Sequence, residues 1–307
     1  MTYNEFKDAI VNNIMDYLPE EFQKLTPKIN TVQKVNRILD GLSLMSEGDE
    51  TGMSPTVYLN MSYNDYVQEA PLQAILREIA GIYIQHYAYG KAMVKELDFK
   101  NSKDKIVFRL INTEKNTEFL ENHPHRSFLD LSVVYCFVFE IEGGANSCYI
   151  SNDMANYIGM NEAELYEAAL KNTATIEPPS IETIVELFMR VTNMSESEMV
   201  QMIGLPRDFP FFAITNTHMY YGASSILYPH ILKGIAERMG SDLYIFPSSV
   251  HEFLTVQVKD GDEEVDVEMM KEFVRCINET SVAPEEVLSD QVYYYNKETG
   301  ELSIAEK

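Results

Sequence analysis

The spacing of apolar residues predicts two helices in the first hundred residues. The first begins at the N-terminus, where four apolar side chains recur at helical spacing: Phe6, Ile10, Ile14 and Tyr17. Thr2 and Glu5 stand three residues apart at its start, which is the spacing of a capping box. Residues 72–87 again place their apolar side chains on one helical face, so they predict the second helix.

Strands are expected between these two helices. Apolar and polar residues alternate in residues 28–35 and 39–47, which is typical of a β-hairpin. Residues 54–60 predict a third strand, so the order is α-β-β-β-α. A polar stretch follows, and we place a domain boundary there. The expected organisation is a small N-terminal unit, residues 1–97, and a larger C-terminal α+β domain, residues 98–307.

The larger domain mixes predicted strands, hairpins and helices. Five stretches predict strands of its sheet: residues 105–112, 133–140, 211–216, 242–247 and 252–258. Helices are expected at residues 161–172, 180–191, 195–203, 229–239 and 265–279, and a closing hairpin at residues 291–305. This mixture favours an α+β fold with mainly antiparallel or mixed sheets and flanking helices. Residues 134–158 and 211–231 share a strand, turn, strand and helix order, which is compatible with a duplicated hairpin-helix unit.

Charge narrows the range of partners. The chain of 307 residues holds 48 Asp and Glu against 24 Lys and Arg, for a formal net charge of −24. A surface this acidic repels phosphate backbones and anionic lipids. Nucleic acid and membranes are therefore not expected partners. Solubility alone explains the acidity. A cationic protein partner, a divalent metal or mimicry of nucleic acid explains it as well.

The cysteines and the N-terminus indicate the cytoplasm. Cys136, Cys148 and Cys276 are odd in number and lack CxxC spacing, so they predict neither a disulfide framework nor a thiolate metal site. The first ten residues lack a basic start followed by an apolar block, so no signal peptide is expected. Reduced thiols fit a cytoplasmic protein.

The stretch IFPSSVHEF, residues 245–253, is the weak catalytic candidate. Ser248 or Ser249 as a nucleophile with His251 as its base, beside Glu252, would describe a hydrolase. A nucleophile elbow needs glycines around the serine, and none stands here. Pro and Ser are common turn formers. The sequence therefore favours a bend between two strands.

A second candidate is the loop ENHPHRSF. His123 and His125 alternate, so both rings can reach one ion if the segment is extended, but no third ligand motif follows. We therefore expect no metal site and no cofactor. The alternative is a polar loop in which the two histidines and Arg126 form hydrogen bonds or contact a ligand.

The end of strand 105–112 carries a third candidate. Arg109, Asn112 and Lys115 could hold an anionic ligand, or they could form a solvated strand end that pairs with carboxylates. The pairing with carboxylates is favoured here. Phosphate-binding loops of the GxxxxGK[ST] and GxGxxG types do not occur.

Several long segments carry a family resemblance. RLINTEKN, HRSFLDLSVVY, ELYEAALKNT, ILYPHILKGIAERMGSDLYIFPSSVHE and APEEVLSDQVYYYNKETGEL resemble an uncharacterised conserved family of anaerobic gut Gram-positive bacteria, described only as a domain of unknown function. The last two thirds also resemble, more distantly, a second uncharacterised family of bacilli. The resemblance implies a cytosolic bacterial protein and implies no site residues.

The functional expectation is therefore general. The leading hypothesis is a non-enzymatic binding or regulatory protein, monomer or homodimer, that acts on a cationic protein partner through an acidic face. The alternative is a hydrolase-like enzyme with a cleft near Ser248 and His251.

Overall fold

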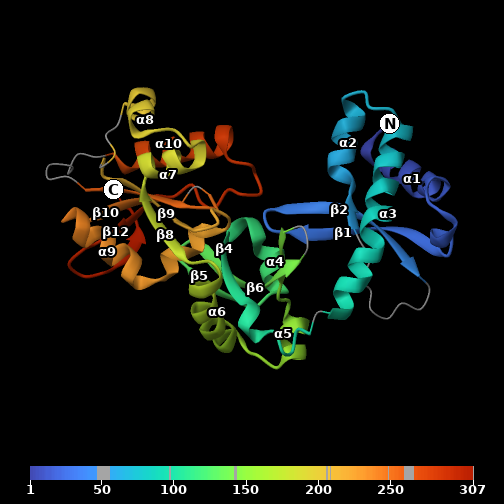
Figure 1. Cartoon of the computed structure of the whole chain (residues 1–307), viewed down its shortest axis with the longest axis horizontal. Coiled ribbons are helices and arrows are strands. Elements are labelled where there is room, and N and C mark those ends of the chain that lie inside the picture. Colours follow the sequence, from blue (N-terminus) through green and yellow to red (C-terminus); the bar gives the residue numbers. More distant parts are fainter. Residues whose placement is uncertain are drawn as a thin grey trace. The chain divides into compact units, whose positions relative to one another are not determined.

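The computed structural model describes residues 1–46, 56–96, 98–141, 144–204, 207, 209–247, 249–258 and 266–306. The chain divides into two compact units, Met1–Phe99 and Lys100–Lys307. Figure 1 shows the ribbon with its elements labelled. The predicted α+β class is confirmed, because helices accompany three separate sheets and every strand pair among the described residues is antiparallel.

The first unit is a three-stranded sheet packed against helices. Its helical elements are α1 (Tyr3–Asn13), η1 (Ile14–Tyr17), η2 (Glu20–Phe22), α2 (Leu59–Val67) and α3 (Leu72–Glu96), and its strands are β1 (Leu25–Lys34), β2 (Arg37–Ser46) and β3 (Thr56–Tyr58). The capping box of Thr2 and Glu5 is confirmed. The third strand is shorter than predicted, because the chain enters α2 at Leu59. Buried side chains from α1, β2 and α3, such as Phe6, Leu42 and Tyr83, form the core.

The second unit contains two sheets. The four-stranded sheet consists of β4 (Ile106–Asn112), β5 (His125–Phe128), β6 (Leu131–Ile141) and β7 (Gly144–Tyr149). β4 pairs with one side of β6, and β5 and β7 pair in succession with its other side. The six-stranded sheet has the order β13 (Leu302–Ile304), β12 (Tyr293–Tyr295), β10 (Leu243–Phe246), β11 (Phe253–Gln257), β9 (Phe211–Asn216) and β8 (Pro179–Thr183).

The prediction of one sheet for this unit is wrong. The five expected strands all form, but β4 and β6 belong to the smaller sheet, and β9, β10 and β11 belong to the larger one. Almost every residue of β4 is buried, including those on alternate faces. A strand buried on both faces lacks the alternation that would have indicated its packing layer.

Residues 180–191 also differ from the prediction of a single helix. Pro179–Thr183 is edge strand β8, where Ile181 pairs with Ile214 of β9. The helix α7 (Ile184–Thr192) starts only after Thr183, whose side chain forms a capping box with Glu186. The capping box therefore ends the strand and begins the helix.

The two segments proposed as a duplicated unit share their order only in part. In residues 134–158 a β6–β7 hairpin leads to α5 (Asn152–Ile158). In residues 211–231 strand β9 is followed by a buried 3-10 helix, η5 (Gly222–Leu227), before α9 (Pro229–Met239). No second strand forms there because the loop turns through two left-handed residues, Met219 and Tyr221.

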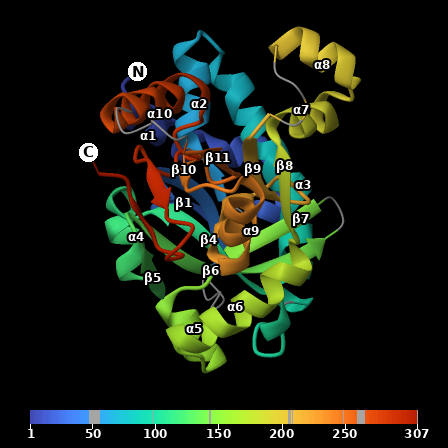
Figure 2. The same ribbon diagram turned by 90° about the vertical axis from the view of Figure 1, so that its left-hand side faces the viewer.

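The remaining helices of this unit are η3 (Lys103–Lys105), η4 (Glu114–Asn116), α4 (Thr117–Glu121), α6 (Glu162–Ile176), α8 (Glu196–Ile203) and α10 (Val267–Ser281). Figure 1 and Figure 2 place α7, α8 and α10 on one face of the six-stranded sheet. α9 lies on the other face, where Arg238 stacks on Phe212 at 4.8 Å. Within the described ranges, no helix has both the length and the apolarity needed to cross a bilayer.

Candidate functional site

The bend between β10 and β11 is held by backbone contacts of His251. Ser249 Oγ accepts a hydrogen bond from the His251 N–H at 3.0 Å. Thr215 Oγ1 of β9 donates to the His251 carbonyl at 2.8 Å. Ser248, the other predicted nucleophile, lies outside the described residues. The hydroxyl groups of Ser249 and Thr215 therefore shape the bend through the backbone.

Both nitrogens of the His251 ring have partners. Nδ1 accepts from the Tyr221 backbone N–H at 3.2 Å, and Nε2 lies 3.2 Å from a carboxylate oxygen of Glu286. A backbone N–H can only donate, so Nδ1 is the unprotonated nitrogen and Nε2 carries the proton. A base for a nucleophile needs a ring nitrogen that accepts from a hydroxyl. Neither nitrogen of His251 meets a hydroxyl of a described residue in this arrangement.

Glu252 is the remaining member of this candidate. Burial raises the pKa of its carboxyl group, an effect that nearby His251 and a hydrogen bond with Ser249 partly offset. Its partner is therefore Ser249, and the carboxylate that contacts the His251 ring belongs to Glu286. Glu286 was not anticipated, because it lies more than thirty residues away in the chain.

The loop of residues 216–222 completes the surroundings of His251. The Asn216 carboxamide accepts from the backbone of His218 and Tyr220 and donates to the Tyr220 carbonyl at 2.9 Å. A Cβ on Gly222 would lie 2.2 Å from Thr215 Oγ1 and 2.5 Å from the Asn216 nitrogen. Only glycine fits there, so the loop is built tightly against β9. It places exposed Tyr220 with its ring centroid 5.3 Å from that of His251.

Arg109 lies in the core of the second unit. It is 2% exposed, and both terminal guanidinium nitrogens donate to the carboxylate of Glu177, which follows α6. The guanidinium also donates to the Phe108 carbonyl at 3.1 Å and lies 4.9 Å from the centroid of the Tyr221 ring. Beside it, burial raises the pKa of the Cys136 thiol to about 11, so this cysteine is neutral. The arrangement joins strand β4 to the segment after α6.

The other two residues of that strand-end candidate lie in different surroundings. Asn112 donates to the Leu288 carbonyl at 2.9 Å and accepts from the Lys115 backbone at 2.8 Å. The Lys115 side chain is exposed. Buried Arg109 and exposed Lys115 therefore do not converge on one ligand.

The HxH loop makes local contacts. His123 Nδ1 lies 2.7 Å from the Phe119 carbonyl, its ring stacks on that of Phe119 at 3.7 Å, and burial lowers its pKa. His125 Nδ1 lies 2.9 Å from the His123 carbonyl. Arg126 donates twice to Glu162, at 3.1 Å each. Among the described residues, no three His, Cys, Asp or Glu side chains are grouped to hold a metal ion.

The face of the larger sheet that carries α7, α8 and α10 has an apolar groove. This groove, with a volume of about 240 Å³, is lined by Phe211, Phe246, Leu254, Val256, Phe273, Val274 and Ile277. Phe273, Val274 and Ile277 come from α10, and the others come from strands β9, β10 and β11. Phe211 and Leu254 also pack against the buried residues of α7 and α8, so the groove extends towards these helices.

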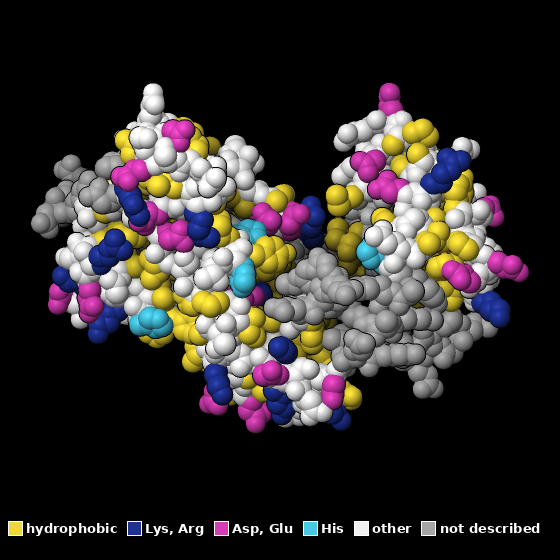
Figure 3. Space-filling view, in the orientation of Figure 1, with side chains coloured by type: hydrophobic (Ala, Val, Ile, Leu, Met, Phe, Trp, Pro, Cys, Tyr) yellow, Lys and Arg dark blue, Asp and Glu magenta, His cyan; other side chains and the backbone are white. Residues whose placement is uncertain are grey.

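Large apolar side chains are exposed on the three helices of this face. Met269 and Phe273, one turn apart on α10, are 66% and 65% exposed. Phe188 and Val191 of α7 and Met202 of α8 are exposed as well. In Figure 3 apolar side chains lie among charged ones where α7 and α8 are placed. Such a concentration of apolar surface is typical of an interaction site.

Carboxylates predominate among the charged groups on the same helices. Three basic side chains on or beside these helices pair with carboxylates: Arg190 with Glu182 at 2.8 Å, Arg207 with Glu186 at 3.1 Å and Lys271 with Glu268 at 3.3 Å, while Arg275 of α10 is exposed. The helices carry further acidic residues at Glu196, Glu198, Asp266, Glu272 and Glu279. The electrostatic potential of the face is therefore expected to be negative.

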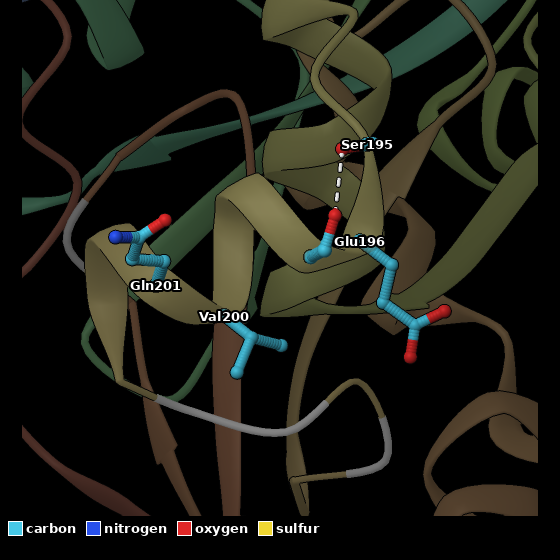
Figure 4. Close-up of a pocket in the computed structure, with 5 residues that line it drawn as sticks. Ser195, Glu196, Val200 and Gln201 are labelled. Carbon is cyan, nitrogen blue, oxygen red and sulfur yellow. Dashed lines mark hydrogen bonds between the residues drawn. The ribbon is translucent and has the colours of Figure 1, made fainter.

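A second hollow, of about 690 Å³, lies on the outer side of α8 and is drawn in Figure 4. It is lined by Ser195, Glu196, Ser197, Val200 and Gln201, and the hydroxyl groups of Ser195 and Ser197 are 3.2 Å apart. All five residues come from one helix and its cap. Among the described residues a ligand would therefore meet no second wall, and the apolar groove is the better defined site.

Comparison with family models decides the family of the chain. The model of DUF5688, a family of unknown function, matches residues 3–297. The chain belongs to DUF5688. Neither the curated proteins nor the solved structures gave a match.

Membership of DUF5688 confirms the resemblance to a family with a domain of unknown function, and it assigns no activity to any residue. The site therefore has to be judged on its geometry. The groove was not anticipated from the sequence, although one signal was present: Met269 and Phe273 occupy positions i and i+4 in α10 while Val274 is buried. Apolar residues on two helical faces indicate that one of them remains uncovered.

Proposed function

We propose that this member of DUF5688 is a non-enzymatic, cytoplasmic binding protein whose partner is a cationic protein. The binding surface is the apolar groove and the acidic helices α7, α8 and α10 around it. The observation that carries the proposal is the exposure of Phe273 beside a groove lined by apolar side chains. An aromatic anchor next to an apolar pocket, with charged residues at the rim, is the usual anatomy of a protein interface.

The free energy gained by burying Phe273 supports its role as an anchor for the partner. A phenylalanine side chain has roughly 200 Å² of surface to bury. Covering the exposed 65% of it removes on the order of 130 Å² from water. At about 25 cal/mol per Å² this contributes about 3 kcal/mol, which is the size of an interface hot spot. Exposed Met269 would add to it.

The hydrolase alternative has less support. It requires His251 to take a proton from a serine hydroxyl, and the Nδ1 of His251 already accepts from the Tyr221 backbone. Its Nε2 faces Glu286. An enzyme of this type would have to break one of these contacts before its first chemical step.

Affinity capture from the native cytosol tests the proposal. The immobilised full-length chain is compared with Phe273→Ser and with Tyr157→Ser, a control that removes a similarly exposed aromatic ring from α5. We expect a protein with a basic isoelectric point to be captured by the wild type and by Tyr157→Ser and to be lost with Phe273→Ser. That protein, purified, should then bind the wild-type chain directly.

The proposal fails if every captured protein is retained equally by Phe273→Ser. Circular dichroism and the melting temperature check that each variant is folded, because an exposed side chain should change stability little. Because charge alone attracts cationic proteins to a chain of net charge −24, only loss with the uncharged Phe273→Ser change identifies the groove.

A further inference from the structure

We infer that the groove binds an amphipathic α-helix of the partner, with apolar anchors on one side and Lys or Arg residues beside them. This inference rests on the proposed function and specifies the partner's conformation. It follows from three properties of the groove: incomplete cover of the sheet, the position of its floor within the sheet, and charge.

The sheet is less well covered on the groove side than on its other side. Along β10, Leu243 and Ile245 are buried, whereas the alternating residues Tyr244 and Phe246 are only half-buried. Along β11, Phe253 and Thr255 are buried, whereas Leu254 and Val256 are half-buried. Because alternate residues face opposite sides of a sheet, the face towards the groove remains partly open.

Two helices border the groove. α10 packs mainly on β10, β12 and β13 through Phe246, Val292 and Ala305, whereas α7 packs on Phe211 and Leu254. The groove lies between these two contact regions.

The strand order decides between a helical and an extended occupant. The floor of the groove belongs to β9, β10 and β11, and each of these strands is already paired on both sides. An extended peptide gains affinity by pairing with a free strand edge. Over interior strands it finds no backbone partners, so its own N–H and C=O groups would be left unpaired as they are buried. A helix pairs its backbone groups internally.

The volume of the groove and the charge around it indicate which side chains the partner helix presents. About 240 Å³ is below the roughly 300–1,000 Å³ of small-molecule sites and suits one or two large apolar side chains. The helices of this face carry exposed carboxylates, such as Glu272 and Glu279 on α10 and Glu198 on α8. Lys and Arg next to the apolar anchors therefore complement the negative charge of these helices, while an acidic helix would be repelled.

Fluorescence anisotropy with synthetic peptides tests the inference on the full-length chain. The probe is an 18-residue peptide with Leu and Phe at positions i, i+3, i+4 and i+7 and with Lys and Arg elsewhere. One matched peptide has two central residues replaced by proline, and another has Glu in place of Lys and Arg. We expect the basic helical peptide to bind at least tenfold more tightly than either. Phe273→Ser should weaken it at least tenfold, and Tyr157→Ser should not.

The outcomes separate this inference from the proposed function. If the proline peptide binds as tightly as the helical one, or if the helical peptide does not bind, the inference of a helical occupant is overturned. If Phe273→Ser still loses the captured cytosolic protein in that case, the proposed binding function stands without the helical occupant. If Phe273→Ser changes neither measurement, both fail. Sedimentation that shows a dimer for the wild type and a monomer for Phe273→Ser would make a second copy of the chain the occupant and would also overturn the inference.

Discussion

The ion pair of Arg109 with Glu177 provides the sharpest test of the core of the second unit. The side chains are 3% and 11% exposed, and two parallel N–H···O contacts join them. We expect Glu177→Gln to leave the guanidinium charge buried without a counter-ion, and Arg109→Met to remove both hydrogen bonds. Arg109→Met with Glu177→Leu replaces the pair by apolar groups of similar size.

The expected magnitudes follow from burial. Removing one partner of a buried ion pair costs about 3–5 kcal/mol, because the other charge remains desolvated. A domain has only about 5–15 kcal/mol of stability, so each single change should remove a large part of it. The double change should remain within about 2 kcal/mol of the wild type, because an apolar pair avoids the desolvation penalty. With Glu177→Leu measured as the second single change, the coupling between the two positions is then about 4 kcal/mol or more.

Urea unfolding, followed by far-ultraviolet circular dichroism and tyrosine fluorescence, measures these differences. Arg207→Met is the control, because it removes an ion pair whose arginine is 53% exposed and should cost at most about 1 kcal/mol. A cost below about 1 kcal/mol for Glu177→Gln, or a double change as costly as the sum of the single ones, would refute the reasoning. A ligand that protects the wild type and not Arg109→Met would instead favour a binding role for Arg109.

Three further predictions concern the bend around His251. In urea unfolding, Gly222→Ala should destabilise the chain by more than about 2 kcal/mol, because the new Cβ would lie 2.2 Å from Thr215 Oγ1. The control Gly234→Ala in α9, where the new Cβ has open space around it, should stabilise the chain by about 0.5–1 kcal/mol in the same assay. Burial raises the pKa of Glu252, so the folded state holds its proton more tightly than the unfolded state, and the stability contributed by Glu252 falls as pH rises above the unfolded pKa. Glu252→Gln should therefore raise the melting temperature more at pH 7 than at pH 4, and equal gains at both would contradict this sign. A fluorophosphonate probe should leave Ser249 and Ser248 unlabelled while His251→Gln lowers the melting temperature; labelling that depends on His251 would restore the hydrolase hypothesis.

The elements governed by local chemistry could be predicted from the sequence. Capping boxes at Thr2, Asn161 and Ser195 and the left-handed Gly240 at the end of α9 are all present, because each depends on residues within one helical turn. Strand pairing across the unit could not be predicted. The partition of β4 and β6 from β9, β10 and β11 depends on contacts between distant segments, and a strand buried on both faces shows no alternation to assign it.

The candidate sites divide in the same way. The bend at His251 and the two nearby serines could be predicted from the sequence. The groups that contact the ring nitrogens of His251 could not, because they belong to Tyr221 and Glu286, which lie thirty or more residues away on either side. The apolar groove is harder still to predict, because it exists where no helix of the chain fully covers the sheet. Leu254 and Val256 have the pattern of an ordinary two-sided strand, and only the packed helices reveal that one side is partly open. Periodicity shows which residues avoid water, whereas an interaction surface consists of residues that the chain itself fails to cover. A binding site of this kind therefore becomes visible only when the fold of the whole unit is known.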